Sequence, residues 1–124
     1  MKKITFKSPT IFAQIADRLR AEIASGVYSP GERLNSVRRF AEELGVTPNT
    51  VQKALTLLGE EGLITSESTA GRFVTENTEV IENLRKKMRN EIALRLCNAA
   101  IRFGFNRDEL IRFVDDYFDS KGHQ

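Results

Sequence analysis

The sequence is poor in the residues and segments that define several protein classes. It has 124 residues, one cysteine and no tryptophan, and none of its apolar runs approaches the ~20 residues of a membrane-spanning helix. Because Cys97 has no second cysteine to pair with, an internal disulfide framework is excluded and a cytoplasmic, reducing location is expected. The opening segment MKKITFKSPT has lysines but no apolar core, so we expect no signal peptide.

Residue patterns typical of metal sites and catalytic sites are also missing. The single histidine, His123, lies near the C-terminus, and one histidine with one cysteine predicts no metal site and no cofactor. Asp115 and Asp116 are adjacent on a predicted helix, so their carboxylates point apart and cannot act as a pair. The sequence contains neither a Ser-His-Asp order nor a phosphate-binding glycine loop. The protein is therefore not expected to be an enzyme, and Cys97 is expected in a core or an interface.

What is present describes a folded protein of modest size. Apolar residues make up 40% of the chain and charged residues 29%, which excludes a disordered chain. The length allows one compact domain with a small appendage. The net charge of +2 is a weak indication of an anionic partner.

The first part of the chain is predicted to begin with a helix and a turn. Apolar residues recur with helical spacing over residues 9–25, and Ser25-Gly26 suits the end of that helix. Pro30-Gly31 predicts a turn because this pair interrupts both helices and strands.

Two short helices follow, with capping residues at the expected ends. Ser36 suits the start of the second helix, and Gly45 suits its end in a left-handed conformation. Thr47 suits the start of the third helix, with Pro48 as its first residue and Gly62 after its end. Two helices joined by three residues that include a glycine predict a helix-turn-helix.

The segment after the third helix predicts a β-hairpin. LIT at 63–65 and RFVT at 72–75 are rich in residues that favour strands, and SESTAG between them forms a loop of about six residues. A hairpin in this place is called a wing. The predicted fold is therefore mainly α: a winged helix-turn-helix domain over residues 1–76 and a two-helix tail over residues 77–124.

The tail is predicted to consist of two amphipathic helices separated by Gly104. Asn106 and Glu109 predict a capping box at the start of the second of them. Because the two helices can cover only part of each other, we expect a second copy to cover the rest, with packing on the winged helix as the alternative. The basic run at 85–89 is expected to be a solvated face rather than a DNA contact. The predicted dimer interface consists of Ile81, Leu84, Met88, Ile92, Leu96, Leu110, Phe113, Val114, Tyr117 and Phe118.

The third helix has a polar face suited to contact with DNA. On a helical wheel, Asn49, Gln52, Lys53 and Thr56 cluster on one side. The opposite side is apolar and consists of Val51, Ala54, Leu55 and Leu58. Asparagine and glutamine can bond adenine, lysine can reach guanine, and a threonine methyl can touch thymine in the major groove. Acidic residues are absent from residues 44–59, so this face does not repel phosphates.

Neighbouring residues add to the same surface. Arg38 and Arg39 place two guanidinium groups at the start of the second helix, beside the entry of the third. Thr47 and Thr50 bring hydroxyls to a helix N-terminus, where free N–H groups favour phosphate. Taken alone, the polar face of the third helix is equally compatible with an ordinary solvated surface. The helix-turn-helix spacing and the two arginines favour DNA binding.

These motifs resemble a known family. The markers GVYSPGERLNSVR, LGVTPNTVQKAL, EGLI and GRFV together resemble the winged-helix domain of the GntR family of bacterial transcription regulators, over residues 9–75. The short helical tail resembles the YtrA-like subfamily. The resemblance implies that Arg38, Asn49 and Gln52 contact bases and that the wing-tip Gly71 lets the backbone enter the minor groove. It also implies contacts to phosphates or the groove edge from Ser36, Thr47, Thr50 and Lys53.

The wing departs from the family pattern, which usually reads like RRGRGTFV. Here it reads ESTAGRFV, so Glu67 stands where a cation is usual and Arg72 follows the glycine. We expect Arg72 to contribute at most a phosphate contact, with a role only at the hairpin edge as the alternative.

The sequence therefore predicts a homodimeric, sequence-specific DNA-binding transcription regulator that represses from a palindromic operator. The alternative is a winged helix that binds protein or RNA without operator specificity. The tail is expected to be too small for a deep ligand pocket of the usual ~300 Å³ or more. A small-molecule effector would then bind at the dimer interface.

Overall fold

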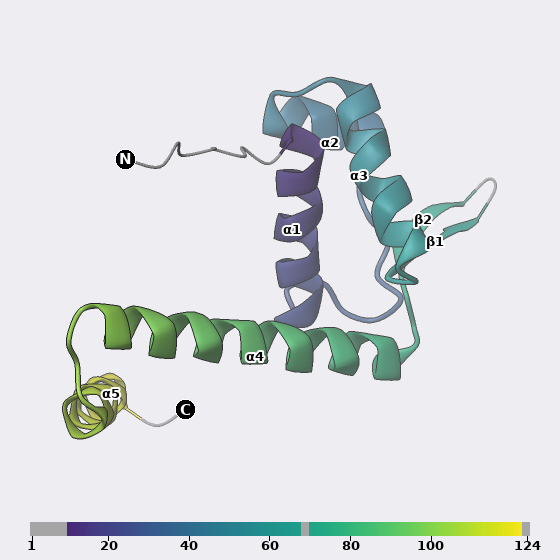
Figure 1. Ribbon diagram of the computed structural model, residues 1–124. Coiled ribbons are helices and arrows are strands. Elements are labelled where there is room, and N and C mark those ends of the chain that lie inside the picture. Colours follow the sequence, from purple (N-terminus) through teal and green to yellow (C-terminus); the bar gives the residue numbers. More distant parts are fainter. Residues whose placement is uncertain (1–9, 68–69, 123–124) are drawn as a thin grey trace, which may run out of the picture. The chain divides into compact units, whose positions relative to one another are not determined.

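The computed structural model describes residues 10–67 and 70–122, which form five helices and one β-hairpin (Figure 1). In chain order the elements are α1 (Ile11–Ala24), α2 (Val37–Leu44), α3 (Pro48–Glu60), β1 (Ile64–Glu67), β2 (Gly71–Val74), α4 (Thr78–Arg102) and α5 (Arg107–Lys121). This order confirms the predicted winged helix-turn-helix with a two-helix tail. Part of the predicted wing loop, residues 68–69, lies outside the described residues, as does His123.

The chain divides into two compact units, Met1–Lys86 and Lys87–Gln124, and the division falls within α4. The boundary drawn from the sequence, at 76–77, lies just before α4 begins. The boundary between the units lies further along the chain than the sequence predicted, because the first turns of α4 pack on the winged helix. Ile81 is 5% exposed and belongs to the winged-helix core, and Leu84 packs against that core. The intramolecular alternative therefore holds for the start of the tail.

Capping hydrogen bonds define the ends of α2 and α3. The Ser36 hydroxyl accepts the backbone N–H three residues on, at 3.1 Å. Gly45 ends α2 with φ +68°, a left-handed conformation that a residue with a Cβ adopts only with strain. The Thr47 hydroxyl accepts the N–H of Thr50 at 3.3 Å, and Pro48 is the first residue of α3. The predicted helix-turn-helix is confirmed down to its caps.

Helices α1 and α3 are joined by a shared core and by one multiple ion pair. Two nitrogens of Arg20 donate to the two carboxylate oxygens of Glu61, each at 2.6 Å, and a third donates to Asp17 at 2.6 Å. The hydrogen bonds to Glu61 raise the pKa of Arg20, although partial desolvation opposes them. Because Glu61 directly follows α3, this contact holds the C-terminal end of α3 to α1. The buried side of α3 consists of Val51, Ala54, Leu55 and Leu58.

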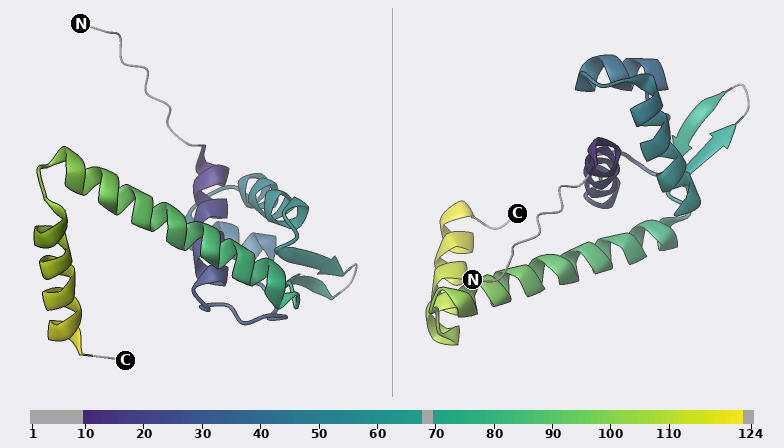
Figure 2. Two further views of the ribbon diagram at one scale, coloured as in Figure 1. Left: turned by 60° about the horizontal axis from the view of Figure 1, so that its bottom comes forward. Right: turned by 45° about the horizontal axis from the view of Figure 1, so that its top comes forward.

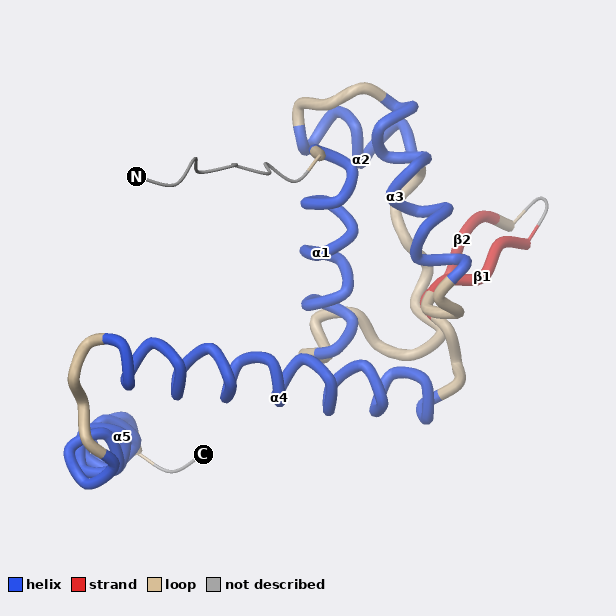
Figure 3. Tube along the Cα trace, in the orientation of Figure 1, coloured by secondary structure: helices blue, strands red, loops and turns tan. Residues whose placement is uncertain are grey.

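The hairpin pairs β1 and β2 antiparallel, with Ile64 opposite Val74 and Glu67 opposite Gly71. It leaves the C-terminal end of α3 on the side away from α1 (Figures 2 and 3). Residues 31–34, predicted only as a turn, also run along β2. The N–H of Gly31 donates to the Val74 carbonyl and the N–H of Leu34 donates to the Arg72 carbonyl, each at 2.9 Å. This extra edge ties the wing to the segment that leads into α2.

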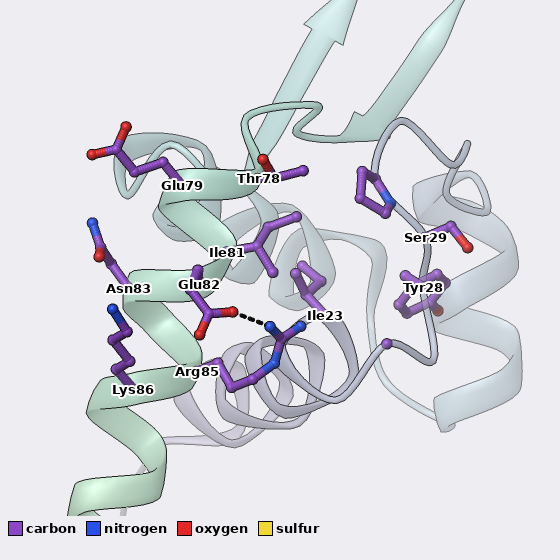
Figure 4. Close-up of a pocket in the computed structure, with 12 residues that line it drawn as sticks. Ile23, Tyr28, Ser29, Thr78, Glu79, Ile81, Glu82, Asn83, Arg85 and Lys86 are labelled. Atoms are coloured by element: carbon purple, nitrogen blue, oxygen red, sulfur yellow. Dashed lines mark hydrogen bonds and ion pairs between the residues drawn. The ribbon is translucent and has the colours of Figure 1, made fainter.

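The first turns of α4 meet the C-terminal end of α1 (Figure 4). Arg85 donates from Nε to the Ala24 carbonyl at 2.8 Å and forms an ion pair with Glu82. Part of the basic run at 85–89 thus caps another helix. Beside this contact lies a hollow of about 670 Å³, lined by Ile23 and Tyr28 and by polar side chains of α4. Burial, and then the charge of Glu22, raise the pKa of Tyr28.

The second unit holds the rest of α4 and α5, joined at Gly104. The Asn106 side chain accepts from Glu109 N, and the Glu109 side chain accepts from Asn106 N, which confirms the predicted capping box.

Apolar side chains between α4 and α5 line a hollow of about 330 Å³. Several of the side chains that line it, among them Phe103 and Phe118, are largely exposed, so the hollow is open to solvent and is not the deep ligand pocket that the sequence predicted to be absent.

Candidate nucleic-acid interface

The exposed face of α3 carries the side chains that the sequence assigned to base contact. Asn49 and Lys53 are exposed, whereas Gln52 is half-buried at the edge of the helix. The buried residues of α3 lie on the opposite face, so the helix is divided as the wheel predicted. A helix with this division can enter a major groove while its apolar side remains in the protein core.

The hydroxyls at the start of α3 are engaged with each other. Thr47 Oγ1 accepts the N–H of Thr50, and the two Oγ1 atoms are 2.8 Å apart. Pro48, the first helical residue, is exposed and has no N–H of its own. Both hydroxyls therefore order the helix start, and the phosphate contacts implied for them remain predictions.

The two arginines of α2 reach solvent but are paired with acids one turn along. Arg38 Nε lies 3.6 Å from Glu42 Oε1, and Arg39 Nε lies 3.1 Å from Glu43 Oε1. The Arg38 side chain is 87% exposed, so its ion pair contributes little stability and can be replaced by a DNA contact. The two acids were not among the residues identified from the sequence, although their spacing of four residues is the expected signal for such pairs.

The wing places Arg72 against α3. Arg72 Nη2 donates to Gln52 Oε1 at 2.9 Å, across 20 residues of sequence. Gln52 Nε2 in turn donates to Thr56 Oγ1 at 3.2 Å. The sequence predicted a phosphate contact or a hairpin-edge role for Arg72; the structure shows a third role, a side-chain contact with a predicted base-reading residue.

A shallow hollow between β2 and the start of α2 gathers three arginines. Its volume is about 560 Å³, and its lining residues are Arg33, Leu34, Asn35, Ser36, Val37, Arg38, Gly71 and Arg72. Among the described residues, those that line the hollow include no acid, so the hollow is suited to a phosphate group. Arg33 was not identifiable from the sequence, because only the pairing of residues 31–34 with β2 brings it to the wing.

Gly71 is required by the same packing. Its φ is +102°, and a Cβ at this position would lie 3.3 Å from Arg33 Nε. The glycine thus allows both the strand's turn and the close approach of the Arg33 side chain. Its implied entry into a minor groove remains a prediction.

The predicted dimer interface divides into two groups. Ile81 is buried in the winged-helix core, so its assignment to the interface is wrong, and Leu84 is partly covered by the same core. The others lie in α4 and α5 with half-buried or exposed side chains: Met88, Ile92, Leu96, Leu110, Phe113, Val114, Tyr117 and Phe118. Phe113 and Phe118 are 62% and 64% exposed. Exposed aromatic side chains at this density are typical of a surface that another protein covers.

Three further features of the described residues concern Cys97, metal binding and membrane insertion. Cys97 is exposed, which excludes the core position considered for it and leaves the interface as the prediction. In residues 10–67 and 70–122, no three His, Cys, Asp or Glu side chains gather as metal ligands would. Within the same ranges, no helix has the length and apolar character needed to cross a bilayer.

Comparison with known proteins agrees with this geometry. The family described as "Bacterial regulatory proteins, gntR family" matches residues 12–74. The uncharacterized HTH-type transcriptional regulator YhcF of Bacillus subtilis is 26% identical over 110 residues, which cover 89% of this chain and 91% of YhcF. The transcriptional repressor YtrA of the same organism is 35% identical over 72 residues, 58% of this chain and 55% of YtrA. The chain thus spans about half the length of YtrA.

A solved structure extends the likeness over both units. A GntR family transcriptional regulator from Listeria monocytogenes is similar with a TM-score of 0.79 and 29% identity, covering 90% of this chain and 98% of that one. An exposed, acid-free α3 face, a capped helix-turn-helix and a wing in contact with α3 are the features expected of a DNA-binding regulator. The chain belongs to the GntR family of bacterial regulatory proteins and is a DNA-binding transcription regulator with YtrA-like relatives.

Proposed function

We propose that this regulator acts in the cytoplasm as a homodimer that represses transcription from a palindromic operator. The observation that carries the proposal is the exposed face of α3, which presents Asn49, Gln52 and Lys53 with no acid between residues 44 and 59. Amide and ammonium groups at this place match the donor and acceptor pattern of base edges in the major groove. The arginine-lined hollow beside it is suited to the flanking phosphates.

The exposed apolar side chains of the second unit support the dimeric part of the proposal. Ile92, Leu96, Phe113, Tyr117 and Phe118 are each about half exposed or more in the single chain. A second copy that covers these side chains would remove them from water, and a two-fold axis would present two α3 helices to one duplex. Half-sites about one helical turn apart, or a multiple of it, follow from that symmetry.

Repression follows from the position of such a site on DNA. A dimer bound at a palindrome that overlaps a promoter excludes polymerase and needs no further activity of its own. The relative YtrA is named a repressor, which favours this direction of control. The apolar hollow between α4 and α5 is the place where a small-molecule effector would alter the proposed interface.

Selection of bound sites from random duplex DNA by the purified chain tests the proposal. We expect enrichment of one palindrome, with two chains bound per duplex. Enrichment of a single, non-repeated half-site would contradict the dimer, and no enrichment above background would contradict sequence-specific binding. A reporter gene placed behind the selected site should fall in expression when the protein is produced; a rise would contradict repression.

A further inference from the structure

The amide of Gln52 is held at both of its ends by other side chains. Arg72 of β2 donates to Oε1 at 2.9 Å, and Nε2 donates to Thr56 Oγ1 at 3.2 Å. Gln52 and Arg72 are both half-buried, so water competes less for the bond between them than at a fully exposed site. The wing thus contacts α3 through the amide of Gln52, one of the groups that the sequence assigned to base contact.

The chemistry of these partners allows only one orientation of the amide. A guanidinium group has donors and no acceptor, so the atom facing Arg72 must be the amide oxygen and not the nitrogen. A glutamine without such a partner can rotate its amide by half a turn and exchange the two atoms. Because exchange would set the Gln52 NH₂ group against the Arg72 donors, the rotation is unfavourable here.

The held amide keeps the groups that adenine requires. Oε1 has a second lone pair, and Nε2 has a second hydrogen. In the major groove, adenine offers the N6 amino donor beside the N7 acceptor, which fits this pair in one orientation. Guanine offers two acceptors, N7 and O6, so an amide oxygen held toward that edge is repelled.

We propose that Arg72 is a positioning residue for sequence recognition: it holds the Gln52 amide in the orientation that reads adenine. The proposal rests on the proposed function, because it assumes that α3 enters a major groove. It assigns to the wing a role in specificity that acts through α3 rather than through the minor groove.

The test measures base preference for wild type, R72A, R72K, Q52A and the double variant R72A/Q52A. Each protein is titrated against the selected operator and against its single base-pair substitutions. A bidentate contact supplies roughly five- to a hundredfold discrimination at one base pair. We expect Q52A to remove this preference, R72A to reduce it to about threefold or less at the same base pair, and R72K to retain more than R72A. The double variant should lose no more preference at that base pair than Q52A alone loses.

R33A serves as the matched control, because Arg33 is also a cation and lines the hollow between β2 and the start of α2 together with Arg72. It should weaken binding to all sites about equally and leave the preference at the Gln52 position unchanged. If R72A behaves like R33A, with uniform weakening and a salt slope reduced by about one, Arg72 is a phosphate contact and the proposal is overturned. Enrichment of no site by wild type would instead reject the proposed function, and the base-reading role with it.

A measurement without DNA tests the positioning role of Arg72 separately from the proposed DNA binding. The side-chain amide protons of Gln52 can be followed by NMR in the full chain. We expect R72A to move these resonances, whereas R33A should leave them in place. Unchanged Gln52 resonances in R72A would overturn the positioning role even if the operator is bound with high affinity. Far-UV circular dichroism of R72A establishes that the variant is folded.

Discussion

At the scale of residues, the interface is built from exposed cations that have weak partners. Arg38 and Arg39 are held by Glu42 and Glu43 across one helical turn, and all four side chains are about half exposed or more. Exposed pairs of this kind contribute about 0.3–0.5 kcal/mol, so exchange of a carboxylate for DNA costs little. The acids prevent α2 from being a purely basic surface, which reduces attraction to any polyanion regardless of sequence.

Replacement of Arg38 by alanine should affect specific binding strongly. We expect R38A to weaken binding to the selected operator by roughly 1–3 kcal/mol and to relax preference at one base pair, because a guanidinium reads guanine in a bidentate way. E42Q is the control, since it removes the partner and leaves the arginine. Titration by fluorescence anisotropy should show E42Q binding as well as wild type or more tightly. Equal operator affinity for R38A and wild type would contradict the assignment.

At the scale of elements, single side chains hold the helices that present α3. Arg20 bonds Glu61 through two nitrogens, whereas Arg18 of the same helix makes one exposed pair with Glu22 at 3.3 Å. R20A should therefore lower the free energy of unfolding by about 1–2 kcal/mol. R18A, the matched control, should change it by less than ~0.5 kcal/mol. Urea denaturation followed by circular dichroism measures both, and equal effects would contradict the structural role of the Arg20 contact.

The contact between α1 and α4 can be tested in the same way. Arg85 donates to the Ala24 carbonyl at the end of α1, so R85A leaves that carbonyl without this donor. We expect R85A to lower the free energy of unfolding of the first unit by about 1 kcal/mol. The neighbouring exposed Lys86 provides the control, and K86A should have an effect below ~0.5 kcal/mol. If the two variants are equally stable, the basic run is only a solvated face, as the sequence alone predicted.

Local features of these elements could be predicted from sequence, and contacts between elements could not. Ser36, Gly45 and Thr47 were identifiable because capping depends on residues within one turn. The contact of Arg72 with Gln52 depends on where the hairpin lies against α3, which no local pattern specifies. For a related reason, the sequence assigned Ile81 to the dimer interface, although it lies in the winged-helix core. Apolar periodicity shows that a helix face is buried, but not which surface covers it.

At the scale of the whole molecule, the prediction concerns association. Phe113 of α5 is 62% exposed in the single chain, and the proposed interface would bury it. F113E would place an unpaired carboxylate there, which should raise the dimer dissociation constant roughly 100-fold or more. Val27, an apolar residue of the first unit that is 63% exposed, provides the control variant V27E. Sedimentation equilibrium should find F113E monomeric and V27E dimeric; a wild-type monomer at micromolar concentration would contradict the dimer itself.

The central claim is that the exposed face of α3 reads base edges in the major groove. The most direct measurement replaces the purines of the selected operator, one at a time, with their 7-deaza analogues. Each replacement removes the N7 acceptor and leaves Watson–Crick pairing intact. We predict affinity losses of roughly five- to a hundredfold at a few purines, in two clusters related by the palindrome. Unchanged affinity at every purine would contradict the account.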